Sequence, residues 1–141
     1  MTFDRITHDS RGKACIRDTG LTVAWILGAM AGGSTRRELL AKHHALESAD
    51  IDEAFAFIKE QVRARELPDM EFRGKELTAP ERSDFRAPAP VSEHLETLIR
   101  RQKTTGVSTE EEAEIEDYLR LDHLLAMIKA VAKLQLLTTV G

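Results

Sequence analysis

The chain has 141 residues, of which 42% are hydrophobic and 31% are charged, and its formal net charge is −4. This balance excludes a disordered or collagen-like chain, and no apolar run is long enough to predict a membrane span. The single cysteine, Cys15, excludes an internal disulfide framework and a zinc site made of several cysteines. The polar segment 1–11 shows no targeting signal, so we expect a cytoplasmic protein.

Residues 3–22 predict short strands separated by turns. Phe3 and Ile6 alternate with polar neighbours, and turn signals occur at Arg11-Gly12-Lys13 and at Asp18-Thr19-Gly20. Strands this short are not stable alone. We therefore expect them to pair with another chain or to pack on the helices that follow.

Three helices are predicted next. The first covers 23–31 by its 3-4 spacing of apolar residues and ends at Gly32-Gly33. The second begins after Thr35, which has capping-box spacing to Glu38. The third follows Ser48 and ends before Pro68, with a stripe made of Ile51, Phe55, Ile58 and Val62.

The second half of the chain predicts a linker and a helical hairpin. Residues 68–91 hold all four prolines and show little periodicity, which indicates a partly extended linker. A helix containing Leu95, Leu98 and Ile99 then precedes a break at Gly106. A second capping box, Ser108 with Glu111, starts a long helix that reaches about residue 137 and spans about 40 Å.

The expected fold is therefore mainly α, with a small helix-turn-helix domain that carries short N-terminal β-strands and a C-terminal helical hairpin. We expect three parts: a domain at 1–67, the linker at 68–91 and the hairpin at 92–141, the last serving partner binding or oligomerisation.

Residues 4–60 resemble the family known as domain of unknown function 433, which groups VapB-type antitoxin-like proteins of prokaryotes. The resemblance is carried by Arg5-Ile6-Thr7, by the block 12–17 (Gly-Lys-Ala-Cys-Ile-Arg), by 21–27 and by Ala31-Gly32-Gly33. It implies a dimeric helix-turn-helix protein that neutralises a PIN-like ribonuclease toxin and binds its operator DNA, and so regulates transcription.

DNA contacts are expected from the basic front third of the chain, where residues 1–45 hold seven Lys or Arg against four Asp or Glu. The start of the third helix, with Asp50, Asp52 and Glu53, is a poor reading end because carboxylates repel phosphates. The expected contacts come from the second helix and from the strands: Arg36, Arg37, Lys42, Arg11, Lys13 and Arg17. The alternative is that these are solvated surface charges.

Toxin binding is expected after residue 67. PIN-like nucleases hold Mg²⁺ with clustered carboxylates, and an arginine can block such a site because it pairs with carboxylate through two hydrogen bonds. The linker offers Arg73, Arg82 and Arg86, unless these only provide solubility.

The long helix offers an apolar grip for a toxin or for a second copy through Leu121, Leu125 and Ile128. Alternatively, the preceding helix covers this face within the chain. A homodimer is expected from this broad face and from the short strands.

No catalytic or metal site is expected. The adjacent His43 and His44 point to different faces of a helix, and no nucleophile–base pair or phosphate-binding loop is visible. We therefore expect no enzyme activity and no cofactor. The rival interpretation is a stand-alone transcription regulator or oligomerisation module that has no toxin.

Overall fold

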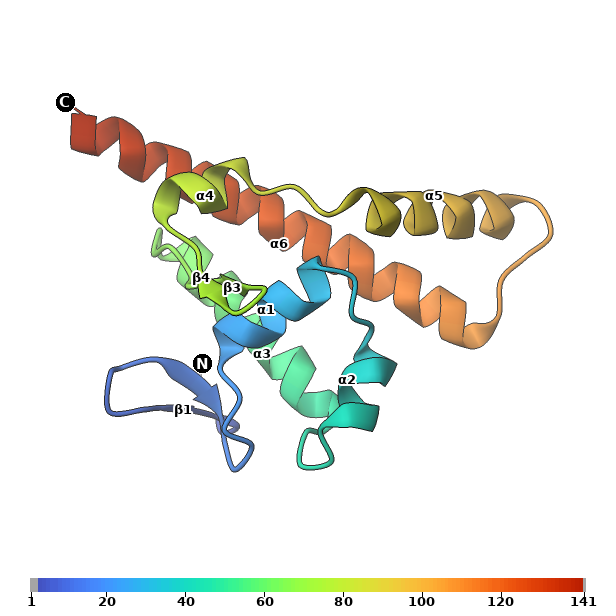
Figure 1. Ribbon diagram of the computed structural model, residues 1–141, viewed down its shortest axis with the longest axis horizontal. Coiled ribbons are helices and arrows are strands. Elements are labelled where there is room, and N and C mark those ends of the chain that lie inside the picture. Colours follow the sequence, from blue (N-terminus) through green and yellow to red (C-terminus); the bar gives the residue numbers. More distant parts are fainter. Residues whose placement is uncertain (1–2, 141) are drawn as a thin grey trace.

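The computed structural model describes residues 3–140. Residues 1, 2 and 141, at the outer ends of the expected domains, lie outside the described part. The chain is mainly helical, as predicted, and two short antiparallel strand pairs accompany the helices. One long helix crosses the molecule, and four other helices pack against it (Figure 1).

The N-terminal strands pair with each other. β1 (Ile6–His8) and β2 (Ala14–Ile16) are antiparallel with Ile6 opposite Ile16, and a single bridge joins Cys15 to Thr22 where a third strand was expected. The side chain of Ile16 is buried in the core. The pair is thus satisfied within the chain, because it has a strand partner and packs on the helices.

The bounds of the next three helices agree closely with the predicted ones. α1 (Val23–Ala31) ends at Gly32, and α2 (Arg36–Lys42) begins with the predicted capping box between Thr35 and Glu38. α3 (Ser48–Arg63) buries the predicted stripe. Its first turn is held by Arg5, whose side chain bonds Asp50 at 3.0 Å and whose backbone N–H donates to Glu53 at 3.2 Å.

The segment expected as a linker is folded. It contains β3 (Glu71–Phe72), β4 (Lys75–Glu76), α4 (Ala79–Asp84) and the start of α5 (Ala89–Lys103). Met70, Leu77 and Phe85 are buried in the main core. The prolines therefore mark helix starts rather than an extended spacer, since Pro80 lies in the first turn of α4 and Pro90 in that of α5.

Two glycines let the β3–β4 hairpin lie directly on α1. A Cβ on Gly28 would lie 1.5 Å from the backbone oxygen of Glu71, and a Cβ on Gly32 would lie 2.8 Å from the ring of Phe72. These positions therefore accept no side chain at this spacing. The Gly28-x-x-x-Gly32 pattern is explained by close packing.

α6 (Thr109–Val140) is the central helix and packs against α1, α3, α4 and α5. Its predicted capping box is confirmed, because the Ser108 hydroxyl accepts from the Glu111 N–H at 3.1 Å and Glu111 accepts from the Ser108 N–H at 3.0 Å. Leu121, Leu125 and Ile128 are buried in the core of their own chain. The predicted grip on another chain is wrong for Leu125 and Ile128, because four helices of the same chain cover this face. Leu121 is buried as well, but it also borders the groove described below.

Candidate functional site

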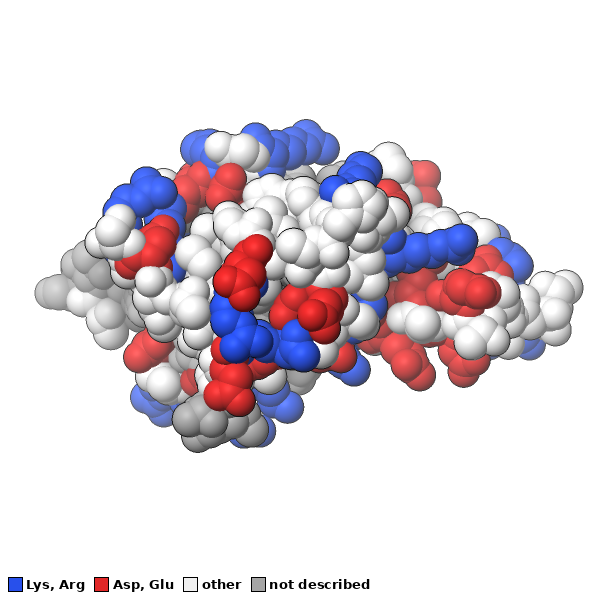
Figure 2. All heavy atoms as spheres, turned by 90° about the horizontal axis from the view of Figure 1, so that it is seen from below, with Lys and Arg blue, Asp and Glu red and all other residues white. Residues whose placement is uncertain are grey.

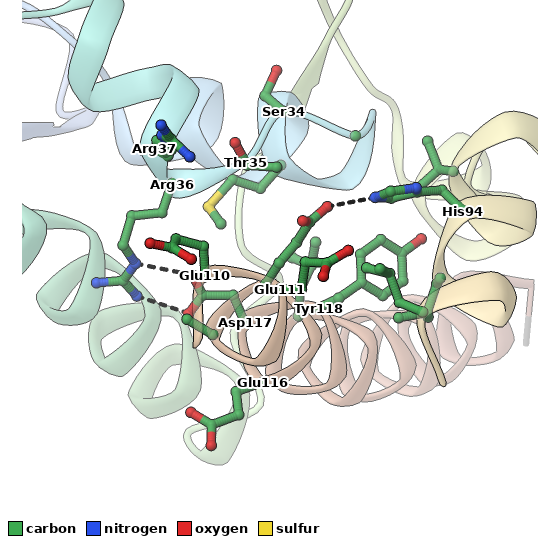
Figure 3. A pocket seen from close by; sticks show the side chains of 18 of the residues that line it. Ser34, Thr35, Arg36, Arg37, His94, Glu110, Glu111, Glu116, Asp117 and Tyr118 are labelled. Atoms are coloured by element: carbon green, nitrogen blue, oxygen red, sulfur yellow. Dashed lines mark hydrogen bonds and ion pairs between the residues drawn. The ribbon is translucent and has the colours of Figure 1, made fainter. Parts of the chain in front are cut away.

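A large groove lies between α2 and α5, with the first half of α6 as its floor (Figure 3). Its volume is about 1010 Å³, and it is open to solvent along one side. One wall is the turn 32–35 with the start of α2, and the other is the inner side of α5. The groove therefore lies between the N-terminal part of the chain, which contains α2, and the C-terminal hairpin of α5 and α6.

The lining of the groove is apolar at its base. Leucine, valine and methionine side chains come from all of its walls, and Tyr118 lies on the floor among them. Burial, followed by the charge of Asp122, raises the pKa of Tyr118, so its hydroxyl stays protonated at neutral pH. The apolar lining residues are Met30, Leu40, Val91, Leu95, Leu98 and Leu121.

The α2 side of the groove is fixed by Arg36. Its Nε and Nη2 donate to the two carboxylate oxygens of Asp117, both at 2.9 Å (Figure 3). Nη2 also lies 2.7 Å from Asp52 Oδ1. Nη1 donates to the Ser48 hydroxyl at 2.8 Å. Burial alone would lower the pKa of Arg36, but the hydrogen bonds to Asp117 and Asp52 outweigh it and raise that pKa. Arg36 thus ties α2, α3 and α6 together.

The α5 side is held on α6 by two polar pairs. His94 Nε2 lies 2.8 Å from Glu114 Oε1, and Arg101 bonds both carboxylate oxygens of Glu111 at 2.7 and 3.1 Å. The backbone N–H of Ser108 and the guanidinium of Arg101 lower the pKa of Glu111. Leu98 supplies the buried apolar contact between the two helices. Both walls are therefore anchored to α6 independently of any occupant.

The rim of the groove carries charges of both signs with an acidic surplus. Glu110 and Glu116 are exposed on α6, and Arg37 is exposed on α2. Figure 2 shows acidic side chains gathered where the α5–α6 hairpin extends beyond the rest of the molecule. An apolar base with a charged rim is the usual composition of a site that binds a protein segment.

The six residues expected to contact DNA come from α2 and from the β1–β2 hairpin and its end, and two of them pair with acidic residues of other elements. Arg36 is occupied by its acidic partners, and Lys13 pairs with Glu76 at 3.3 Å. Arg37 and Lys42 are exposed on α2, while Arg11 and Arg17 are exposed in and after the β1–β2 hairpin. The carboxylates at the start of α3 form ion pairs within the chain: Asp50 pairs with Arg5, and Asp52 pairs with Arg36. The hydrogen bond from Arg36 lowers the pKa of Asp52 below its ordinary value.

The three arginines expected to enter a nuclease site differ in their surroundings. Arg82 is almost buried and donates to the backbone oxygen of Pro68 at 2.7 Å. Arg73 is exposed and lies over the Phe72 ring at 5.0 Å, and Arg86 is exposed between α4 and α5. Two of the three, Arg73 and Arg86, are therefore accessible to a partner.

Among residues 3–140, no group of three or more His, Cys, Asp or Glu side chains is placed to hold a metal ion. Across the same residues, no helix has the length and apolar character needed to cross a membrane.

Sequence reasoning did not predict the groove. Leu95 and Leu98 were expected only as cover for α6, and the two glycines after α1 only as a helix end. The turn at Gly33, with φ at 108°, sets Val91 directly beside it, so that a Cβ there would lie 2.8 Å from Val91 Cγ2. This contact brings the start of α5 to the groove, and it follows from the fold rather than from a local pattern.

Comparison with known proteins gives one family. Residues 8–58 match the model described as "Protein of unknown function (DUF433)". No curated protein and no solved structure matches the chain. The matched residues cover β2 and α1 and α2 entirely, and they reach most of the way along α3, so they supply one wall of the groove.

Proposed function

We propose that the chain, whose residues 8–58 match the model of proteins of unknown function 433, is an antitoxin-like protein of the cytoplasm. In this proposal it binds a PIN-like ribonuclease toxin by taking a helix or extended segment of the toxin into the groove between α2 and α5. Its role is binding rather than catalysis.

The observation that carries the proposal is the groove itself. Its volume of about 1010 Å³ lies at the upper end of what small-molecule pockets reach, and its open side suits a polypeptide segment better than an enclosed ligand. An amphipathic helix docks in such a groove through apolar anchors at one face, while charges on the rim fix its orientation. Leu40, Val91 and Leu95 are partly exposed in the lining and are available as contacts.

Neutralisation needs a second contact besides the groove. A toxin that holds Mg²⁺ with clustered carboxylates is blocked when a guanidinium pairs with them. Arg73 and Arg86 are the exposed arginines of the segment between α3 and α5, and Arg82 is not available. We assign inhibition to Arg73 or Arg86, and affinity to the groove.

Operator binding is the weaker half of the proposal. Four basic side chains, Arg11, Arg17, Arg37 and Lys42, remain exposed for phosphate contacts. They come from a loop and from a seven-residue helix, and the overall charge of −4 opposes strong DNA affinity.

The test is a search for a PIN-like reading frame beside this gene, followed by co-purification of its product with the full chain and a ribonuclease assay. Leu95→Glu adds a charge inside the groove and should abolish co-purification and restore ribonuclease activity. The matched control is Ser92→Glu, which adds the same charge at an exposed position of α5 outside the groove. Equal loss of co-purification with both variants, or no loss with Leu95→Glu, would exclude the groove as the toxin-binding site. The absence of a PIN-like neighbour would favour a stand-alone regulator.

A further inference from the structure

A second surface of α6 is apolar and uncovered. The large hydrophobic residues that are exposed among residues 3–138 all lie on this helix: Leu119 at 52%, Leu134 at 55% and Leu137 at 72%. The side chains between them on the same face are exposed as well. They form a line whose members are three or four residues apart: Leu119, His123, Ala126, Ala130, Leu134 and Leu137. We call this line the outer stripe.

The outer stripe has the spacing of a helix–helix seam. Apolar residues that repeat every three and four positions meet the corresponding side chains of a second helix. The groove uses a different face of α6, because Tyr118 and Leu121 point toward α2 and α5. A third face of α6, which contains Leu125 and Ile128, packs into the core. The outer stripe is therefore the one long apolar face of α6 that the described part of this chain leaves uncovered.

The arrangement along the stripe is symmetric about its centre. Ala126 and Ala130 are small and allow two helices to approach closely, and larger apolar residues lie on both sides of them. Leu119 precedes the alanines by about two turns, and Leu134 and Leu137 follow them by one to two turns. An antiparallel copy of α6, centred on the alanines, would thus place Leu119 of each chain against the Leu134–Leu137 end of the other.

The charges beside the stripe fit the same pairing. Asp122 and Lys133 are both exposed and are separated by about three turns, so they lie along the same edge of the helix. In an antiparallel pair, residues on the same edge of the two helices face each other. Asp122 of one chain then lies opposite Lys133 of the other, twice by symmetry. In a parallel pair the same edge of the two helices lies on opposite sides of the interface, so Asp122 of one chain would not meet Lys133 of the other.

We propose that the outer stripe binds the outer stripe of a second copy, so that two α6 helices pack antiparallel about Ala126 and Ala130 in a two-fold symmetric dimer. Such an interface is self-complementary and closed, as expected for a homodimer. It involves neither the groove nor residues 8–58, so partner binding and dimerisation are separable properties.

The first test is light scattering with the full chain across micromolar concentrations. The expected mass is twice the 15.8 kDa of one chain. The double variant Leu119→Glu, Leu134→Glu should raise the dissociation constant at least tenfold while circular dichroism shows unchanged helix content. The control variant Thr97→Glu, Gln102→Glu adds the same charges to exposed positions of α5 and should remain dimeric. A monomeric chain, or a dimer that survives the first variant, would overturn the proposal.

The second test concerns the direction of the helices. Asp122→Lys should weaken the dimer several-fold, and adding Lys133→Asp should restore it. In a Cys15→Ser background, spin labels at position 112 of the two chains should be about 50 Å apart in the antiparallel dimer and about 10 Å apart in a parallel one. A short distance, or no rescue by the double reversal, would overturn the proposed pairing even if the chain is a dimer.

Discussion

The carboxylate of Asp117 on α6 accepts two hydrogen bonds from the guanidinium of Arg36 on α2, both at 2.9 Å. The two residues are 81 positions apart in the sequence, and their side chains are only 19% and 16% exposed. This pair joins the part of the chain that matches the family model to the C-terminal helix, and it also forms one wall of the groove.

Replacing Arg36 by Ala should therefore destabilise the protein. The change leaves Asp117 without its forked partner in a half-buried position, and a loss of about 2–3 kcal/mol is expected. Urea unfolding at neutral pH measures it. Arg37→Ala is the matched control, because Arg37 is the next residue on the same helix and is exposed, and its change should be within about 0.5 kcal/mol. Equal effects of the two variants would show that the Arg36–Asp117 pair adds nothing.

The local elements could be predicted from the sequence because their signals are local. The capping boxes at Thr35 and Ser108 need only a hydroxyl and a glutamate three residues apart, and both are present in the structure. The same signal at Thr78, with Glu81, was overlooked because the surrounding prolines suggested a linker, yet its capping box also forms.

The β3–β4 hairpin was missed for a similar reason. Its turn residues are Arg73 and Gly74, both with positive φ, and Arg73 is a weaker signal there than asparagine or aspartate.

The site was less predictable because it depends on which faces meet. The periodicity of α6 showed a broad apolar surface, but it did not show that Leu121 and Leu125 face inward while Leu119 and Leu134 face outward. The charge of Arg36 suggested DNA contact, whereas its acidic partner lies far along the chain. Long-range pairs of this kind leave no trace in a single sequence.

A chain cut after residue 67 should not fold. The core is continuous from Ile16 to Val131, and α1 and α3 pack against α6, whose Leu121, Leu125 and Ile128 belong to this core. Removing these three contacts costs about 1.5–3 kcal/mol each, which together approaches the whole stability of a small domain. Circular dichroism and the chemical-shift dispersion of the amide protons report whether a fragment of residues 1–67 is folded. A cooperative unfolding transition in this fragment would contradict the single shared core.

Acid should reduce the stability of the β3–β4 hairpin and α4, because Glu81 becomes protonated. The ammonium of Lys75 at 2.9 Å, followed by the N–H and hydroxyl of Thr78, lowers the pKa of Glu81 to about 2 from its ordinary value of 4.5. Because the folded pKa is the lower one, this stabilisation is complete above pH 4.5 and is lost as the pH falls toward 2.

Glu81→Gln should therefore lower the free energy of unfolding at pH 7 and should flatten its decline between pH 4.5 and 2. The effect is small because the group is exposed. Urea unfolding at pH 7 and pH 3 measures both values. If the free energy of unfolding fell by the same amount between pH 7 and pH 3 in the variant as in the original chain, Glu81 would not be the group that causes this fall.

DNA affinity should depend on the four exposed basic residues and not on Arg36. Replacing Arg11, Arg17, Arg37 and Lys42 by Ala should weaken operator binding and reduce its salt dependence by about 0.9 in log–log slope for each phosphate contact removed. Fluorescence anisotropy at several salt concentrations measures the slope. Unchanged slope and affinity in this variant, with the fold intact, would place the DNA contacts elsewhere.

The most direct test of the central claim is amide hydrogen exchange of the full chain with and without the PIN-like toxin. The account predicts new protection at the turn before α2, along the inner side of α5 and at the start of α6, namely residues 33–40, 91–98 and 110–121. The outer stripe near Ala126 should exchange equally in both samples. Protection confined to other segments, with none at α2 and α5, would contradict the groove as the partner site.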